Sequence, residues 1–76
     1  MDTEKAQKVR AMIAEVLGFE AKDIQDEDKF ITDYRISYTE RKNLLERLNA
    51  EFGKSLDFTA FCQLETVESI LQAYLA

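Results

Sequence analysis

The sequence predicts an all-α fold: a small four-helix bundle with three main helices, a short third helix and a long first loop. Three stretches repeat apolar residues at three- and four-residue steps, which is the spacing of one helix face. Gly18 and Gly53, the two glycines of the chain, each follow such a stretch, where helices commonly end in the left-handed conformation. No segment alternates apolar and polar residues for long enough to predict a strand.

The first helix is expected to begin near Asp2 or Thr3 and to end before Gly18, with Glu4 in its first turn, where an acid is favourable. Its apolar face consists of Val9, Met12, Ile13, Val16 and Leu17. The second helix is expected to end before Gly53. Its apolar face consists of Leu44, Leu45, Leu48 and Phe52.

The last third of the chain holds the other two helices. Thr66 is a candidate cap for a C-terminal helix, since its hydroxyl can accept a bond from a first-turn amide. The apolar stripe of that helix consists of Val67, Ile70, Leu71, Tyr74 and Leu75. Before it, one or two short turns of helix are expected in the apolar cluster formed by Leu56, Phe58, Phe61, Cys62 and Leu64.

The connection from Gly18 to Ile36 is unusually long. Structureless loops beyond about 12–15 residues are uncommon in compact domains. Four apolar residues punctuate this loop and are expected to pin it to the bundle: Phe19, Ile24, Phe30 and Ile31. The sequence therefore predicts an ordered loop that packs against the helices.

Size and composition predict the domain organisation and the compartment. The chain has 76 residues, 46% of them hydrophobic, and is expected to form one domain over residues 1–76. A single cysteine excludes an intramolecular disulfide and fits a reducing compartment. We expect no signal peptide and no membrane span, because no apolar stretch has the required length or position. A cytoplasmic monomer is therefore expected.

Charge narrows the classes of partner. Fifteen acids against ten bases give a net charge of −5. This balance argues against nucleic acid, whose phosphates favour clustered lysine and arginine. It favours partner proteins that present a basic surface.

No residue pattern predicts catalysis or metal binding, so we assign no catalytic residue and no metal ligand and do not expect an enzyme. The chain has no histidine, and Cys62 lies in an apolar cluster without a base to activate its thiol. The acidic loop fails the calcium-loop pattern. Counted from Asp23, the sixth position is Asp28 instead of glycine and the twelfth is Tyr34 instead of glutamate.

Ser37 is the one residue whose place in the sequence fits both a structural role, as a helix cap, and a chemical role, as a site for a phosphate group. Ser37-Tyr38-Thr39-Glu40 has the pattern of a capping box, in which serine and glutamate satisfy each other's backbone amides. The same position presents a hydroxyl at the electropositive end of a helix, which attracts phosphate. The residues alone leave both roles open.

The chain resembles the acyl carrier protein family over nearly its whole length, without a gap. The matching residues are Val9, Ile13, Leu17, Gly18, Ile24, Phe30, Ile31, Asp33, Leu44, Leu45, Leu48, Glu51, Phe52, Leu56, Leu64, Thr66 and Val67. The resemblance implies a four-helix bundle with a short third helix that holds an acyl chain between its helices.

The resemblance also implies a prosthetic group. In this family a phosphopantetheinyl transferase joins 4′-phosphopantetheine to the serine of an Asp-Ser-Leu motif at the start of the second helix, and the arm carries acyl groups as thioesters. In the gapless register, Ser37, Tyr38 and Thr39 occupy these three places, and Arg35 stands where the family usually has glycine. A slip of one residue places Ser37 at the attachment position.

Two functional hypotheses follow from the resemblance. In the first, Ser37 bears phosphopantetheine, and the protein works with acyl-processing enzymes in fatty-acid, polyketide or related lipid biosynthesis. The residues expected to line the acyl pocket are Phe30, Ile31, Leu44, Leu45 and Leu71. In the second, a degenerate carrier fold without a prosthetic group is a protein-interaction or regulatory module. Its partner surface would contain Tyr38, Arg41 and Lys42.

The charge of the second helix separates the chain from the family pattern. That helix is strongly acidic in the family and docks on basic patches of partner enzymes. Here residues 39–52 are neutral, since three acids balance three bases: Glu40, Glu46, Glu51, Arg41, Lys42 and Arg47. This difference favours the second hypothesis.

Overall fold

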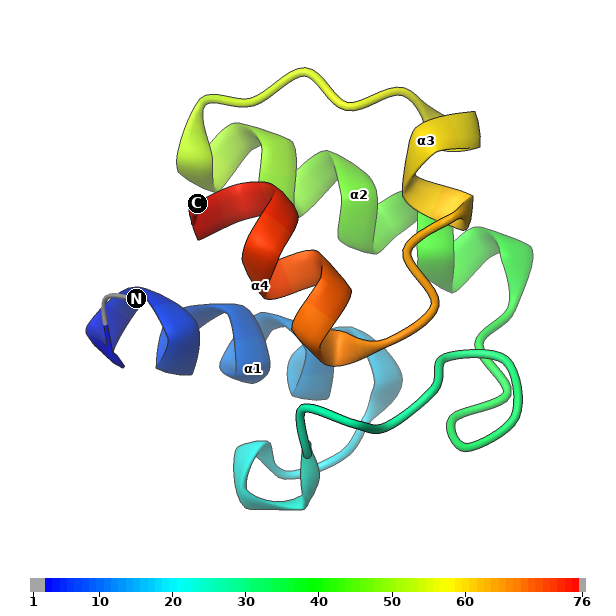
Figure 1. Cartoon of the computed structure of the whole chain (residues 1–76). Coiled ribbons are helices and arrows are strands. Elements are labelled where there is room, and N and C mark those ends of the chain that lie inside the picture. Colours follow the sequence, from blue (N-terminus) through cyan, green and yellow to red (C-terminus); the bar gives the residue numbers. More distant parts are fainter. Residues whose placement is uncertain (1–2, 76) are drawn as a thin grey trace.

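A computed structural model describes residues 3–75 and shows four α-helices and one 3₁₀ turn (Figure 1). The elements are α1 (Thr3–Leu17), η1 (Ala21–Asp23), α2 (Tyr38–Phe52), α3 (Phe58–Cys62) and α4 (Val67–Leu75). Within residues 3–75 the only β-type pairing is an isolated bridge between Lys29 and Thr66. The predicted all-α bundle with a short third helix is confirmed. Asp2, the alternative start of the first helix, lies outside the described residues.

The helix ends follow from local sequence. Gly53 ends α2 in the left-handed conformation, with φ 64°, and its amide donates to the carbonyl of Asn49. Thr66 precedes α4, and its Oγ1 accepts a hydrogen bond from the Ser69 amide at 3.1 Å, so the expected cap is confirmed. Asp57 caps α3 in the same way, since its Oδ1 accepts from the Ala60 amide at 2.7 Å.

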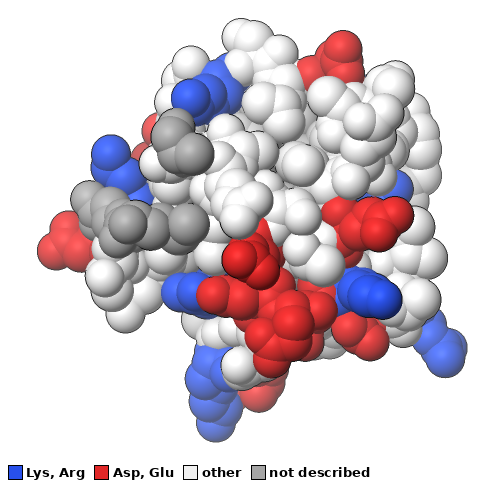
Figure 2. All heavy atoms as spheres, in the orientation of Figure 1, with Lys and Arg blue, Asp and Glu red and all other residues white. Residues whose placement is uncertain are grey.

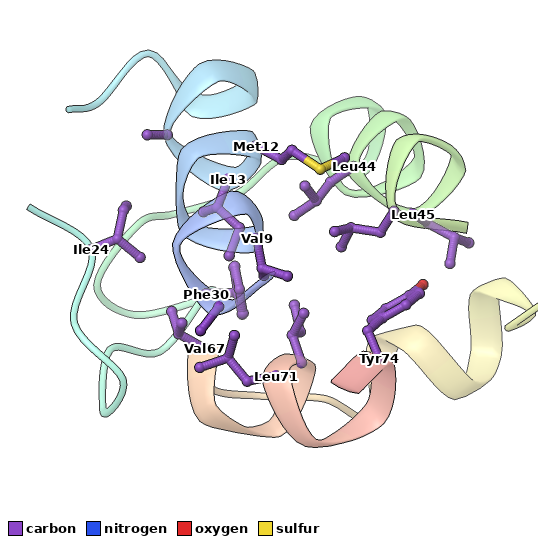
Figure 3. Close-up of a cluster of buried hydrophobic side chains, with 14 of the residues drawn as sticks. Val9, Met12, Ile13, Ile24, Phe30, Leu44, Leu45, Val67, Leu71 and Tyr74 are labelled. Atoms are coloured by element: carbon purple, nitrogen blue, oxygen red, sulfur yellow. The ribbon is translucent and has the colours of Figure 1, made fainter. Parts of the chain in front are cut away.

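One hydrophobic core joins the four helices and the long loop (Figure 3). Figure 3 shows side chains of α1, α2 and α4 pointing toward one another, with Ile24 and Phe30 entering from the loop. Burial of apolar side chains is the main favourable contribution to folding in so small a domain. The fully buried larger side chains are Val9, Ile13, Leu44, Leu48, Val67, Ile70 and Leu71.

A polar chain at the edge of the core links α4 to α2 and to the segment before α3. The Tyr74 hydroxyl donates to Asn49 Oδ1 at 2.8 Å, and Asn49 Nδ2 donates to the carbonyl of Leu56 at 3.0 Å. Tyr74 is only 3% exposed. Its phenol therefore depends on Asn49 for a partner, because a buried donor without an acceptor is costly.

We predict a loss of stability in alkali that depends on Tyr74. Burial raises the pKa of Tyr74 from 10.0 to about 12. The folded protein therefore holds the Tyr74 proton more tightly than the unfolded chain does. The stabilisation that protonated Tyr74 gives the fold is complete below about pH 10 and is lost between pH 10 and 12. Urea unfolding measured across this range should show the fall, and Tyr74→Phe should reduce its slope. An identical slope in both proteins would contradict the prediction.

Backbone hydrogen bonds fasten the long loop to the bundle, which confirms that it is ordered and packed. The Phe30 amide donates to the carbonyl of Glu65 at 3.0 Å, and the Glu68 amide donates to that of Asp26 at 2.9 Å. Asp26 also accepts from Arg10 of α1 at 2.6 Å. The loop is thereby tied to both α1 and the start of α4.

Only two of the four apolar loop residues that were expected to pack against the bundle reach its core. Ile24 and Phe30 are each 3% exposed, whereas Phe19 is 42% and Ile31 is 63% exposed. The expectation that Ile31 pins the loop is therefore wrong. A turn closes across this segment, because the Lys29 amide donates to Asp33 Oδ2 at 2.8 Å and the Asp33 amide donates to the Lys29 carbonyl at 2.9 Å.

None of the helices within residues 3–75 combines the length and the apolar character needed to cross a bilayer.

Candidate functional site

Ser37 is the N-cap of α2, and both halves of the predicted capping box are present. Its Oγ accepts a hydrogen bond from the Glu40 amide at 3.1 Å, and its own amide donates to Glu40 Oε1 at 2.9 Å. Its backbone is extended, with φ −81° and ψ 167°, as an N-cap requires. The residue is exposed. The cap therefore leaves the hydroxyl on the surface of the molecule.

The surroundings of the Ser37 hydroxyl suit an attached phosphate. The oxygen accepts one hydrogen bond, so it keeps a lone pair, and its proton is donated to no acceptor within residues 3–75. The amides of Tyr38 and Thr39 likewise have no acceptor in that part of the chain. Free first-turn amides and the helix dipole together stabilise an anion at a helix N-terminus. A phosphodiester on Ser37 fits this environment.

Arg35, two residues before the cap, has a left-handed backbone with φ 52°. In the gapless register this is the position where the acyl carrier family usually has glycine. Glycine adopts a positive φ without steric cost, whereas a residue with a Cβ does not. The observed backbone therefore supports the gapless register, in which Ser37 corresponds to the aspartate of the family motif and Tyr38 to its serine.

We predict that Arg35→Gly stabilises the protein by about 0.5–1 kcal/mol. The left-handed conformation costs an L-residue roughly 1–2 kcal/mol, and the greater freedom of glycine in the unfolded chain offsets part of the gain. Urea unfolding of the variant checks the prediction. Arg35→Ala is the control, since it removes the guanidinium and keeps the Cβ. A gain of stability in the alanine variant as large as in the glycine variant would show that charge, and not backbone strain, is responsible.

Tyr38 begins α2 and is 67% exposed. Its ring lies against Phe58 of α3, with 4.9 Å between the ring centroids. The aromatic pair thus joins the starts of α2 and α3 next to the Ser37 hydroxyl. Sequence reasoning placed Tyr38 on a partner surface but missed its contact with Phe58, which lies 20 residues away in the chain.

The five residues expected to form an acyl pocket do not come together. Phe30, Leu44, Leu45 and Leu71 share the core and are between 0% and 6% exposed. Ile31 lies outside, at a surface hollow of about 250 Å³ that it shares with Lys29, Thr32 and Glu65. The structure therefore separates Ile31 from the other four.

Asp28 of the long loop has structural partners. Asp28 Oδ2 accepts from the Gln25 amide at 3.0 Å and from the Tyr34 hydroxyl at 2.7 Å. Burial, and next this hydrogen bond, raise the pKa of Tyr34. Within residues 3–75, no three side chains of the metal-binding types are gathered as a metal ion requires. Cys62 is half-buried at the end of α3.

Comparison with known proteins identifies the family. A family model described as "Phosphopantetheine attachment site" matches residues 7–74, and a search of curated proteins finds no match. Domains of this family are attachment sites for the 4′-phosphopantetheine prosthetic group and are carriers without catalytic activity of their own. The matched range includes the capped start of α2 and extends from α1 into α4. The chain therefore belongs to the phosphopantetheine attachment-site family, as a member of the acyl carrier protein type.

Proposed function

We propose that residues 1–76 form a single acyl carrier domain that bears 4′-phosphopantetheine on Ser37 Oγ. The observation that carries the proposal is the exposed Ser37 hydroxyl at the start of α2, inside the matched range. When attached, the group supplies a thiol that holds acyl intermediates as thioesters. The domain itself catalyses nothing. Its role is tethering, which raises the local concentration of the acyl group near its enzymes.

The residues around Ser37 would hold the attached phosphate. The amides of Tyr38 and Thr39 would donate to its oxygens, and the positive end of the 15-residue helix α2 would stabilise its charge. Glu40 opposes this effect, since its carboxylate already lies 2.9 Å from the Ser37 amide. We expect Glu40 to move away from that amide when the phosphate is present.

The acyl chain would be sheltered between Phe30, Leu44, Leu45 and Leu71. These side chains are closely packed, so they must part to admit a chain. Ile31 would contact an acyl chain or a partner only from the surface. We propose fatty-acid or polyketide-type lipid biosynthesis as the setting, with a phosphopantetheinyl transferase and acyl-processing enzymes as partners. We also propose that the protein is a cytoplasmic monomer.

A second candidate function rests on the register of the site. The left-handed Arg35 and the capping role of Ser37 both support a register in which Tyr38 takes the place of the modified serine. In that case the chain is a degenerate carrier fold without a prosthetic group, and it acts through protein contacts. Its partner surface would contain Tyr38, Arg41 and Lys42.

Intact mass measurement distinguishes these functions. The purified protein is incubated with coenzyme A and a broad-specificity phosphopantetheinyl transferase, and an authentic acyl carrier protein is the positive control. The carrier proposal predicts a mass gain of one phosphopantetheine. No gain with several transferases, each active on the control, would contradict it and favour the degenerate module.

A further inference from the structure

Three bases lie at or just before the start of α2, in a protein with an excess of acid. Arg35, Arg41 and Lys42 form no ion pair within residues 3–75, although the net charge is −5. Lys8, Arg10, Lys22 and Arg47, by contrast, each form an ion pair. The unpaired cations at the start of α2 are therefore available to a partner.

Arg41 and Lys42 share a helix face with the exposed aromatic ring of Tyr38. Tyr38, Arg41 and Lys42 are at positions i, i+3 and i+4, which lie together on an α-helix. Tyr38 and Lys42 also line an open hollow of about 420 Å³, and Phe58 supports the tyrosine ring from α3. An exposed aromatic residue flanked by arginine is typical of a protein-binding surface. We call these residues the cationic face: Tyr38, Arg41, Lys42 and Phe58.

Two acids at the starts of α2 and α3 accept hydrogen bonds from helix amides. Glu40 accepts from the Ser37 amide at 2.9 Å, and Asp57 accepts from the Ala60 amide at 2.7 Å, so each carboxylate faces the positive end of a helix. Glu46 lines the same hollow as Tyr38 and Lys42 and has no hydrogen bond or ion pair to residues 3–75. Within residues 3–75, the unpaired bases of the cationic face, Arg41 and Lys42, therefore outnumber the unpaired acid beside them.

One region of the surface is distinctly acidic. Figure 2 shows acidic side chains gathered in the lower middle of the face drawn, where Figure 1 shows the connection between α1 and α2 passing the start of α4. The net charge of −5 disfavours a long polyanion or an anionic membrane, since either would extend beyond the cationic face. A short acidic segment can contact the cationic face alone.

We infer that the cationic face docks an acidic, amphipathic segment of a partner protein. This inference rests on the proposed function, which gives Tyr38, Arg41 and Lys42 as a partner surface, and it specifies the partner. The net charge of the whole chain predicts a partner with a basic surface, whereas this surface predicts an acidic one. Attraction between the opposite charges would speed association and fix orientation, and Tyr38 would supply the apolar anchor.

A titration followed by NMR tests the inference. Two synthetic amphipathic helical peptides are added to the ¹⁵N-labelled chain: one with a glutamate-rich polar face and one in which every glutamate is replaced by lysine. The acidic peptide should shift the amides of residues 35–42, and its affinity should fall as salt is added. The R41E/K42E variant should bind it about tenfold more weakly, since two attractive contacts become repulsive. The R41Q/K42Q variant should give an intermediate affinity.

Lys54 provides the matched control. It is exposed, has no ion pair within residues 3–75 and follows the opposite end of α2. Lys54→Glu should leave the affinity for the acidic peptide within about twofold, since it changes only the long-range charge. Three results would overturn the inference: stronger binding of the basic peptide at residues 35–42, shifts centred elsewhere, or an equal loss from Lys54→Glu.

The peptide titration needs no attached phosphopantetheine, so its outcome is independent of the mass measurement. If the chain gains no mass but binds the acidic peptide, the docking surface is supported and the carrier proposal fails. If the chain gains mass but does not bind the peptide, the carrier proposal is supported and the acidic partner is refuted.

Discussion

Leu48→Ala is expected to destabilise the protein by about 2–5 kcal/mol, the usual cost of truncating a leucine in a closely packed core. Leu48 is 0% exposed and lies on the face of α2 that packs in the common core. Small domains have total stabilities of roughly 5–10 kcal/mol, so the variant should lose a large share of its folded stability. Urea unfolding followed by circular dichroism measures this change.

Ile31→Ala is the control for Leu48→Ala. Ile31 is 63% exposed, so its truncation removes little buried surface and should change stability by less than about 0.5 kcal/mol. If both variants lose the same stability, then Ile31 packs against the core in solution and its placement on the surface is wrong. In that case Ile31 would rejoin the candidates for the acyl pocket.

Ser37→Asn is expected to abolish labelling by the transferase while the fold stays intact. Asparagine caps helices about as well as serine, so stability should change by only a few tenths of a kcal/mol. Asparagine has no hydroxyl to esterify. Ser37→Ala should also abolish labelling, but it removes the acceptor for the Glu40 amide and should cost about 0.5–2 kcal/mol. Intact mass and urea unfolding, measured on both variants, separate the chemical role of Ser37 from its structural role.

Tyr38→Phe completes the comparison at the start of α2. It keeps the ring against Phe58 and removes only the phenol. The variant should be labelled as well as the natural chain if Ser37 is the acceptor. If labelling is retained in Ser37→Asn and lost in Tyr38→Phe, then Tyr38, which takes the place of the family serine in the gapless register, is the residue that is modified.

Local sequence signals predicted most of the fold. The apolar stripes before Gly18 and Gly53 predicted α1 and α2, and Thr66 predicted the start of α4. These predictions succeeded because helix faces and caps depend on residues within one or two turns of each other. Asp57 is a similar signal for the start of α3, because it lies three residues before Ala60, whose amide it caps. The prediction of α3 did not include this cap.

Contacts between distant segments could not be predicted in the same way. Phe30 and Ile31 are both apolar, yet Phe30 is 3% exposed and Ile31 is 63% exposed. Hydrogen bonds of this segment to Asp33 and to the distant Glu65 fix its backbone. The bond from Tyr74 to Asn49 joins residues 25 positions apart. Such choices depend on tertiary packing, which residue type alone does not specify.

The candidate site was predicted in part. The capping box at Ser37 was predicted from four consecutive residues and is present. The positive φ of Arg35 was not predicted, because its conformation is imposed by the loop and is unfavourable for arginine. This unpredicted feature is what bears on the register, and with it on whether Ser37 or Tyr38 takes the place of the modified serine.

The central claim, that Ser37 Oγ bears the arm, is tested most directly by fragmenting the labelled protein. Peptides covering residues 36–41 are isolated after incubation with coenzyme A and the transferase, and tandem mass spectrometry locates the added group. Our account predicts the phosphopantetheine mass on fragments that contain Ser37 and on none that contain Tyr38 without Ser37. Finding the group on Tyr38, or on no residue of this segment, would contradict it.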